Sequence, residues 1–307
     1  MEQNEKSLTT KRIIIYLAIT FGVTYLLSFA VIYPAVNSIS VGMQMLGQLL
    51  VGSIMFIPAI GVLLTRLITK EGFKDSYIVP KTGKKSIPYF LFGWFGPWVL
   101  IILGAIVFYV IFPDKFDSGM SYMAATLSAQ GTEVTADMLK MTMIAQSLTA
   151  LLIGPLLNIF TCFGEEWGWR GYLLPKMQEK FSLPVVLLVN GIIWGLWHAP
   201  LTAIGHNYGV GYWGYPFTGI LAMCCFCIVI GVIFTFITIR TGSCLPAALA
   251  HGSLNGFAAA PLFFADVNAN ISPFVGPAST GIIGGSAFIV CAIIMAVVMI
   301  KDTKKTT

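Results

Sequence analysis

The chain has 307 residues, of which 57% are hydrophobic and only 10% are charged, and its mean hydropathy is +0.84. Soluble globular domains carry about 25% charged residues, so this composition excludes a soluble protein and predicts an integral membrane protein. The net charge of +5 is explained by the distribution of lysine and arginine between apolar segments, which indicates membrane topology and not nucleic-acid binding.

Eight apolar segments follow one another along the chain, each close to the ~20 residues that a helix needs to cross a bilayer. The predicted spans are Ile13–Ala35, Met43–Leu64, Ile87–Phe112, Met141–Cys162, Leu183–Ala203, Tyr215–Ile239, Cys244–Phe264 and Gly281–Ile300. No small-residue cleavage site follows the first segment, so we expect a retained transmembrane helix and not a removed signal peptide. The predicted fold is all-α, a polytopic bundle of about eight helices in a single membrane domain over residues 1–307.

Lysine and arginine lie almost entirely between alternate segments. All of the 18 basic residues except Lys115 and Lys140 precede the first predicted span or follow the second, fourth, sixth or eighth. Because such residues are retained on the cytoplasmic side, we expect an even number of spans with both termini cytoplasmic, in the plasma membrane of a bacterium. The longest outer loop is mildly acidic, and Thr135 within it is predicted to cap a helix that begins at Ala136.

Two adjacent glutamates, Glu165 and Glu166, interrupt the apolar sequence after the fourth segment. A carboxylate at membrane depth is costly unless another group pairs with it or a function uses it. Glu166 and Arg170 are four residues apart and share a helix face, so we expect Arg170 to neutralise Glu166. Glu165 is rotated by about 100° from Glu166 and is expected to face a cavity, on the helix face that also carries Asn158 and Cys162.

Two later segments carry further polar stripes at helical spacing. Their members are Asn190, Trp194 and His198 in the fifth segment, and His251 and Asn255 in the seventh. Three helices that each carry such a stripe hide it most simply by facing one another, which predicts a polar pocket inside the bundle. We expect this pocket to open toward the cytoplasmic half. The remaining histidine, His206, lies in a loop sequence and is predicted to be exposed.

These residue types suit hydrolysis of a peptide bond. A glutamate can take a proton from water with help from a histidine, and histidine and asparagine can donate hydrogen bonds to an oxyanion. Glu165, His198 and His251 could equally bind zinc, which would activate the water itself. The six cysteines lie in or beside apolar segments without paired C-x-x-C spacing, so we interpret them as buried hydrophobic residues.

The spacing of these residues resembles a known family. Glu165-Glu166-x-x-x-Arg170, Trp194-x-x-x-His198 and His251-x-x-x-Asn255 look like the three motifs, in order, of the CAAX-protease and bacteriocin-processing family of intramembrane proteases. The motif-bearing part, residues 141–257, is the predicted catalytic core. Family members are often called metalloproteases, although a metal-independent glutamate mechanism is also argued, so zinc stays open.

The resemblance implies a role for each motif residue. Glu165 would activate the attacking water with help from His198, and His251 and Asn255 would stabilise the oxyanion. Glu166 and Arg170 would hold the site together, and Trp194 stands where phenylalanine is usual. The implied enzyme is an intramembrane endopeptidase, similar to CAAX prenyl endopeptidases, acting on a peptide or protein held at the lipid membrane. Whether that substrate is lipidated is left open.

Two other kinds of function remain as alternatives. A non-catalytic membrane scaffold or bacteriocin-immunity protein would bind a peptide and keep the motifs for folding, consistent with the link of bacterial relatives in this family to bacteriocin maturation or self-immunity. A proton- or ion-coupled transporter would use Glu165 and the histidines as a relay. The transporter predicts an inverted repeat, and the sequence contains none.

Overall fold

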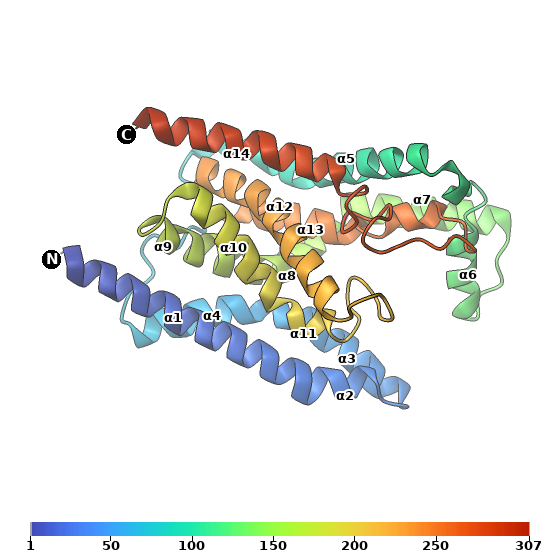
Figure 1. The fold of residues 1–307 in the computed structure, drawn as a ribbon, viewed down its shortest axis with the longest axis horizontal. Coiled ribbons are helices and arrows are strands. Elements are labelled where there is room, and N and C mark those ends of the chain that lie inside the picture. Colours follow the sequence, from blue (N-terminus) through green and yellow to red (C-terminus); the bar gives the residue numbers. More distant parts are fainter. Residues whose placement is uncertain (1, 307) are drawn as a thin grey trace.

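Every regular element in residues 2–306, the part of the chain that the computed structural model describes, is a helix (Figure 1). Within these residues, β-type pairing is limited to one isolated bridge between Phe116 and Ala265. The predicted all-α fold is confirmed. The helices are α1 (Glu2–Leu27), α2 (Tyr33–Val36), α3 (Val41–Ser53), α4 (Ile57–Ile68), α5 (Ile87–Ile111), α6 (Ser121–Ala129), α7 (Ala136–Leu152), α8 (Gly154–Gly168), α9 (Leu174–Gln178), α10 (Leu183–Trp197), α11 (Ala199–Thr202), α12 (Phe217–Thr241), α13 (Leu245–Phe257) and α14 (Ser286–Thr306). Shorter π or 3-10 turns are η1 (Ser28–Ile32), η2 (Ile54–Phe56), η3 (Gly83–Ser86), η4 (Pro113–Lys115), η5 (Trp169–Leu173) and η6 (Ala260–Phe264).

Five helical stretches in the described part of the chain are long and apolar enough to cross a membrane. They are Ser7–Val36, Val41–Ile68, Gly83–Ile111, Phe217–Thr241 and Ser286–Lys304. They coincide with the first, second, third, sixth and eighth spans predicted from the sequence. At the start of α7, the Thr135 hydroxyl accepts a hydrogen bond from the Met138 N–H at 3.3 Å, which confirms the predicted cap.

The other three predicted spans differ from the prediction. α10 has 15 residues and α13 has 13, fewer than the ~20 of a straight crossing. α7 and the helix after it meet at 51°, and the predicted span Met141–Cys162 runs across this bend. The bend follows from Pro155 in the first turn of α8, which has no N–H to donate to a carbonyl of α7. The structure thus gives five candidate spans, or six if the bent pair is one, and does not reproduce all eight.

The helix that carries the two glutamates is longer than predicted. α8, η5 and α9 follow one another without a loop, so helical backbone continues from Gly154 to Gln178. Arg170 therefore lies inside the bundle, fully buried, and not in a loop after the span. Its positive charge is buried in the bundle and should not be counted with the loop lysines and arginines that indicate topology.

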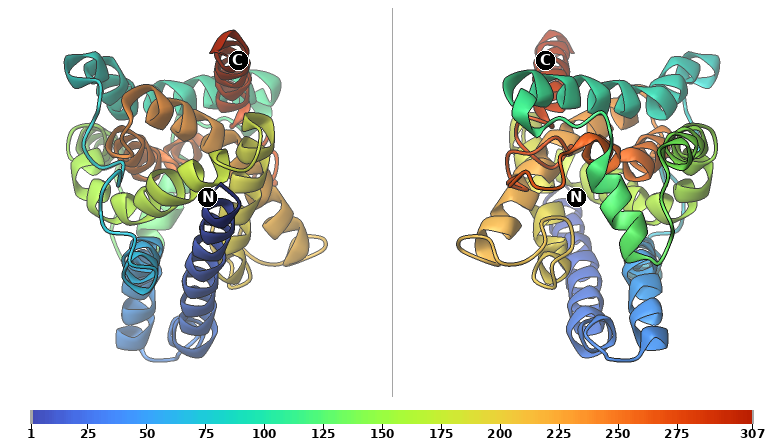
Figure 2. Two further views of the ribbon diagram at one scale, coloured as in Figure 1. Left: turned by 90° about the vertical axis from the view of Figure 1, so that its left-hand side faces the viewer. Right: turned by 90° about the vertical axis from the view of Figure 1, so that its right-hand side faces the viewer.

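Helix α13 lies between α8 and α5, and α10 lies against α12 (Figures 1 and 2). Glycines allow the second of these pairs to approach closely. A Cβ atom on Gly191 would lie 2.5 Å from the Ile228 Cα, and one on Gly195 would lie 2.4 Å from the Cys224 Cα. Only glycine fits at such distances, as at other small-residue contacts between membrane helices. This contact fixes α10, and with it Trp194, against α12.

The start of α13 lies inside the bundle, which explains its short length. Cys244, which precedes it, is fully buried, and its N–H donates to the Tyr77 carbonyl at 2.8 Å. The segment around Tyr77 reaches inward, and the Trp167 indole N–H donates to the Ser76 carbonyl at 2.9 Å. His251 consequently lies beside Glu166 although it follows Cys244 by only seven residues.

The two ends of the bundle differ in charge. α9, both ends of the chain and the loop from 70 to 85 lie at one end, and α6 and the loops 203–216 and 265–285 lie at the other (Figures 1 and 2). Ion pairs link elements at the first end, which we call the basic end: Lys176 with Glu71, Arg12 with Glu71 and Arg240 with Asp302. We call the opposite end the loop end.

Candidate active site

A cavity of ≈ 520 Å³ lies within the bundle and contains most of the residues singled out in the sequence. Glu165 of α8, His198 after α10, and His251 and Asn255 of α13 all line it. Side chains from all three predicted stripes therefore meet at one cavity. Glu166 and Arg170 lie behind the cavity wall, since neither is among its lining residues.

Glu165 faces the cavity with a neutral partner. Its side chain is 1% exposed, and its Oε2 accepts a hydrogen bond from the Trp194 indole N–H at 2.7 Å. Among the residues that the structure describes, Glu165 forms no ion pair. The bond to Trp194 holds one carboxylate oxygen in place and leaves the other for the cavity.

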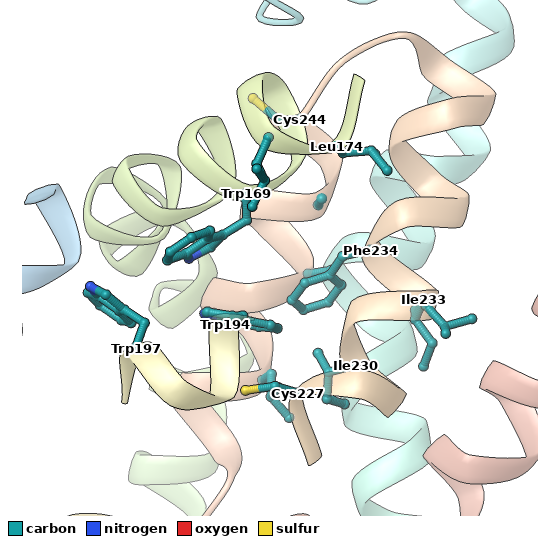
Figure 3. Close-up of a cluster of buried hydrophobic side chains, with 14 of the residues drawn as sticks. Trp169, Leu174, Trp194, Trp197, Cys227, Ile230, Ile233, Phe234 and Cys244 are labelled. Carbon is teal, nitrogen blue, oxygen red and sulfur yellow. The ribbon is translucent and has the colours of Figure 1, made fainter. Parts of the chain in front are cut away.

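Glu166 is neutralised, as predicted, by Arg170. The Arg170 Nη1 lies 3.2 Å from Oε2 and 3.3 Å from Oε1 of Glu166, and both side chains are fully buried. The centre of the guanidinium lies 4.1 Å from the centroid of the Trp194 ring and 5.4 Å from that of Phe234. Figure 3 shows these two rings side by side in the buried cluster. Attraction between a cation and aromatic faces adds to the ion pair and offsets part of the cost of burying the charge.

His251 is oriented by the same glutamate. Its Nδ1 lies 2.9 Å from the Glu166 Oε1, and the residue is 5% exposed. Because a carboxylate accepts, Nδ1 carries the proton of this bond, and Nε2 remains for the cavity. The ring also meets the Trp194 ring edge to face at 5.4 Å. Glu166 thus links Arg170 to His251 over 85 positions in the sequence.

His198 directly follows the last residue of α10. Its Nδ1 lies 2.9 Å from the Trp194 carbonyl oxygen. A carbonyl can only accept, so Nδ1 donates, and the neutral ring then has an unprotonated Nε2 that can accept a proton. Trp194 therefore positions Glu165 through its indole N–H and His198 through its carbonyl.

Asn255 and the remaining polar residues of the stripes are placed differently. Asn255 is exposed at the cavity, and its Nδ2 lies 3.7 Å from the Cys162 Sγ. Asn158 donates instead to the Gly252 carbonyl at 3.1 Å, and Asn190 donates to the Trp169 carbonyl at 3.3 Å. Asn158 and Asn190 connect helices and do not line the cavity.

Several residues of the site carried no signal in the sequence. The cavity is also lined by Met55, by Cys227 and by residues 278–280 of the loop before α14. His206 is exposed, as predicted, but lies at the edge of the same cavity with Asn207. These positions lack a recognisable motif, and only the packing of distant segments brings them to the site.

The residues predicted as zinc ligands do not form a ligand set in this structure. Within the described residues, no group of three His, Cys, Asp or Glu side chains is arranged to hold a metal ion. Nδ1 of His251 bonds to Glu166, and Nδ1 of His198 bonds to a backbone carbonyl. Zinc binding remains a prediction from the sequence.

The cavity lies toward the loop end of the bundle. The end of α10, the end of α13 and residues 206–207 and 278–280 surround it. The sequence predicted that both termini are cytoplasmic and that the pocket opens toward the cytoplasmic half. These two predictions conflict in this fold, because the termini and the cavity lie toward opposite ends of the bundle. Glu165 precedes a basic stretch closely in the sequence, but helical backbone continues from it to Gln178 and separates it from the basic end.

Comparisons with known proteins give one family match and several similar proteins. Residues 147–257 match the family described as type II CAAX prenyl endopeptidase Rce1-like. CAAX prenyl protease 2 of Methanococcus maripaludis is 43% identical over 44 residues, which are 14% of this chain and 16% of that protein. Lysostaphin resistance protein A of Staphylococcus haemolyticus is 28% identical over 169 residues, or 55% of this chain and 42% of that protein. The protein of the same name in Staphylococcus epidermidis is 30% identical over 163 residues, or 53% and 39%. The matches cover less than half the length of each of these relatives.

Proposed function

Since the chain belongs, through residues 147–257, to the Rce1-like family of CAAX prenyl endopeptidases, we propose that it is an intramembrane endopeptidase. It hydrolyses a peptide bond in a peptide or protein held at the membrane, in a bundle that crosses the bilayer eight times. The single observation that carries this proposal is the difference between the two adjacent glutamates. Glu166 is paired with Arg170 and His251, whereas Glu165 faces a cavity and, among the described residues, accepts its hydrogen bond from the neutral N–H of Trp194.

The first step of the proposed reaction is attack by water. The Glu165 carboxylate takes a proton from a water molecule in the cavity while the water oxygen bonds to the carbonyl carbon of the substrate. Nε2 of His198 accepts a hydrogen bond from the same water and orients it. The Trp194 contacts to both groups support this role, because they fix the two acceptors relative to each other.

The second step is collapse of the tetrahedral intermediate. Its oxyanion accepts hydrogen bonds from the Asn255 Nδ2 and from Nε2 of His251. Nε2 of His251 donates only when the ring carries both protons, with Nδ1 bonded to Glu166, and the negative charge of the oxyanion then balances the imidazolium. The proton held by Glu165 passes to the nitrogen of the leaving amine as the C–N bond breaks, which returns Glu165 to the carboxylate.

The test is cleavage of a reporter peptide library by the purified full chain in liposomes. We expect cleavage by the wild type, loss in Glu165→Gln and His198→Ala, and no loss in Glu133→Gln, which makes the same chemical change in an exposed loop. A chelator added to the wild type decides between zinc and Glu165 alone as the activator of water. Equal cleavage by Glu165→Gln and wild type would refute the proposal.

A second candidate function comes from the names of two relatives. Lysostaphin resistance protein A matches over more than half of this chain, so we propose, as the alternative, a role in resistance or immunity that does not depend on catalysis. In that case the polar contacts serve folding alone, and Glu165→Gln should support the same resistance phenotype as the wild type. Loss of the phenotype in a folded Glu165→Gln variant would favour the endopeptidase.

A further inference from the structure

The mouth of the cavity and the basic residues lie at opposite ends of the bundle. α10 begins near the basic end, α13 begins inside the bundle, and the cavity is lined by residues at the last turns of both helices, such as His198 and Asn255. α12 runs the other way, and the cavity is lined by residues of its first half, such as Met223 and Cys227. The exposed residues His206 and Asn207 mark the mouth at the loop end.

The way from the cavity to the basic end is closed by packed side chains. Glu166, Arg170, Trp169 and Leu173 are all fully buried, so no solvent reaches the layer beneath Glu165. Farther along the same helix, Lys176 is tied to Glu71. Of the two ends of the described bundle, the cavity therefore opens only toward the loop end.

The charges of the two ends differ strongly. Among the residues that the structure describes, the loop end has two basic side chains, Lys115 and Lys140, and the acidic residues Asp114, Asp117, Glu133, Asp137 and Asp266. The other loop lysines and arginines lie at the basic end. Because lysine and arginine are retained in the cytoplasm during membrane insertion, the basic end is the cytoplasmic one.

We infer that the site takes its substrate from the extracytoplasmic side of the membrane: a peptide or protein exposed at, or held in, the outer leaflet. This inference rests on the proposed function for the reaction, but the direction of access rests on the position of the cavity and the distribution of charge. Proteins confined to the cytoplasm are excluded as substrates, because the closed layer of side chains around Arg170 lies between them and Glu165.

A second cavity offers a route from the outer leaflet. This cavity of ≈ 860 Å³ lies between α12, α14 and the loops at the loop end, and it shares Phe226, Ser279 and Thr280 with the site. It is bordered by exposed apolar side chains such as Trp213 and Leu221. An apolar segment of a substrate lying in the outer leaflet can occupy it while the adjoining peptide bond reaches Glu165.

Orientation is tested by cysteine labelling of the full chain in intact bacterial cells. Trp213→Cys places a thiol at the loop end and Lys84→Cys places one at the basic end, and both positions are exposed. With a membrane-impermeant maleimide, we expect Trp213→Cys to be labelled in intact cells and Lys84→Cys only after lysis. The parent chain measures background from its own cysteines. Any result in which Trp213→Cys is not the more accessible position overturns the inference.

Access is tested separately with an impermeant reporter peptide that the purified chain cleaves. We expect intact cells with the wild type to cleave it and cells with Glu165→Gln to leave it intact. Cleavage only after lysis overturns the inference. The expected labelling with no cleavage by the purified chain would instead refute the endopeptidase and leave the orientation standing.

Thr280→Trp, compared with Thr280→Ser, should reduce cleavage of a reporter with an apolar anchor more than cleavage of a short soluble one, and equal effects would exclude the second cavity as the route.

Discussion

The basic end and the cavity surround their glutamates in opposite ways. At the basic end, Glu71 forms ion pairs with Lys176 and Arg12. In the cavity, Glu165 has the neutral indole N–H of Trp194 as its partner. Glu71 is also close to water, with 13% of its side chain exposed, whereas Glu165 lies deep in the bundle. Of these two carboxylates, the more deeply buried one, Glu165, forms no ion pair with the residues that the structure describes, which supports its proposed role as the reactive group.

Glu166 stands between these two cases. It lies next to Glu165 in the sequence, but its ion pair with Arg170 is fully buried and rests against Trp194 and Phe234. A buried ion pair contributes little compared with apolar packing, but loss of one partner is costly because the other charge is left behind. We therefore expect changes at Glu165, Arg170 and Glu71 to have distinct effects on activity and stability.

The largest expected effect is on activity, in Glu165→Gln. Loss of the proton acceptor should reduce the cleavage rate by about 10²–10⁴-fold. The free energy of unfolding should change little, because the amide keeps the shape of the side chain and can still accept from Trp194. Activity is measured by reporter cleavage and stability by thermal unfolding in detergent. A variant that is both inactive and unfolded would show that Glu165 is needed for folding.

The next effect is on stability, in Arg170→Met. Removing the guanidinium leaves the Glu166 carboxylate buried without its cation, which should cost about 3–5 kcal/mol in the free energy of unfolding. Chemical denaturation in detergent measures this loss. Arg170→Lys should be intermediate, since an ammonium keeps the charge but cannot cover both aromatic rings. Adding Glu166→Gln to Arg170→Met should recover part of the loss, and no recovery would show that packing alone is responsible.

A smaller effect is expected in Gly231→Ala on α12. A Cβ atom at this position would lie 3.1 Å from the Arg170 Nη2, so the guanidinium must shift from its place in the ion pair. Overpacking of this kind typically costs about 1–3 kcal/mol, measured by the same denaturation. Gly22→Ala on α1 is the control, because a Cβ atom there would meet nothing within 4 Å. Equal stability of the two variants would show that Gly231 does not make room for Arg170.

The smallest effect is a pH dependence at Glu71. Burial raises the pKa of Glu71, but the hydrogen bond and charge of Lys176, together with a hydrogen bond from Tyr172, outweigh it and hold the pKa below its ordinary value of 4.5. A folded-state pKa below the unfolded one stabilises the protein above the unfolded pKa, and this stabilisation is lost as pH falls through the folded pKa. In Glu71→Gln we expect a loss of about 1 kcal/mol at neutral pH that shrinks on acidification below 4.5.

The measurement for Glu71 is the melting temperature of wild type and variant across the acid range. Asp75→Asn is the matched control, because Asp75 pairs with Lys81 at 3.0 Å on the exposed surface. We expect the Asp75→Asn melting curve to follow the wild type at neutral pH. A constant difference between Glu71→Gln and wild type at every pH would mean that the charge of Glu71 does not contribute.

Local spacing predicted the faces of the helices but not their ends. The i, i+4 spacing of Glu166 and Arg170 predicted their pairing, and the rotation of Glu165 predicted that it faces a cavity. The same spacing placed Asn190 with Trp194, yet Asn190 donates to the Trp169 carbonyl instead. A stripe defines a direction over one or two turns, whereas the neighbour that it meets depends on the packing of another helix.

Composition and helical periodicity are local properties, and they were sufficient to predict the membrane class, the all-α fold and the motif residues. The tertiary structure was needed to show that α7 bends from α8, that α13 begins inside the bundle, and that Glu166 meets His251 across 85 positions. It was also needed to show that the cavity lies toward the loop end. The depth of each motif residue in the bundle, and its distance from the other motif residues, depend on where each helix starts relative to its neighbours. Close contacts between helices, such as Gly195 against Cys224, set those positions by long-range packing.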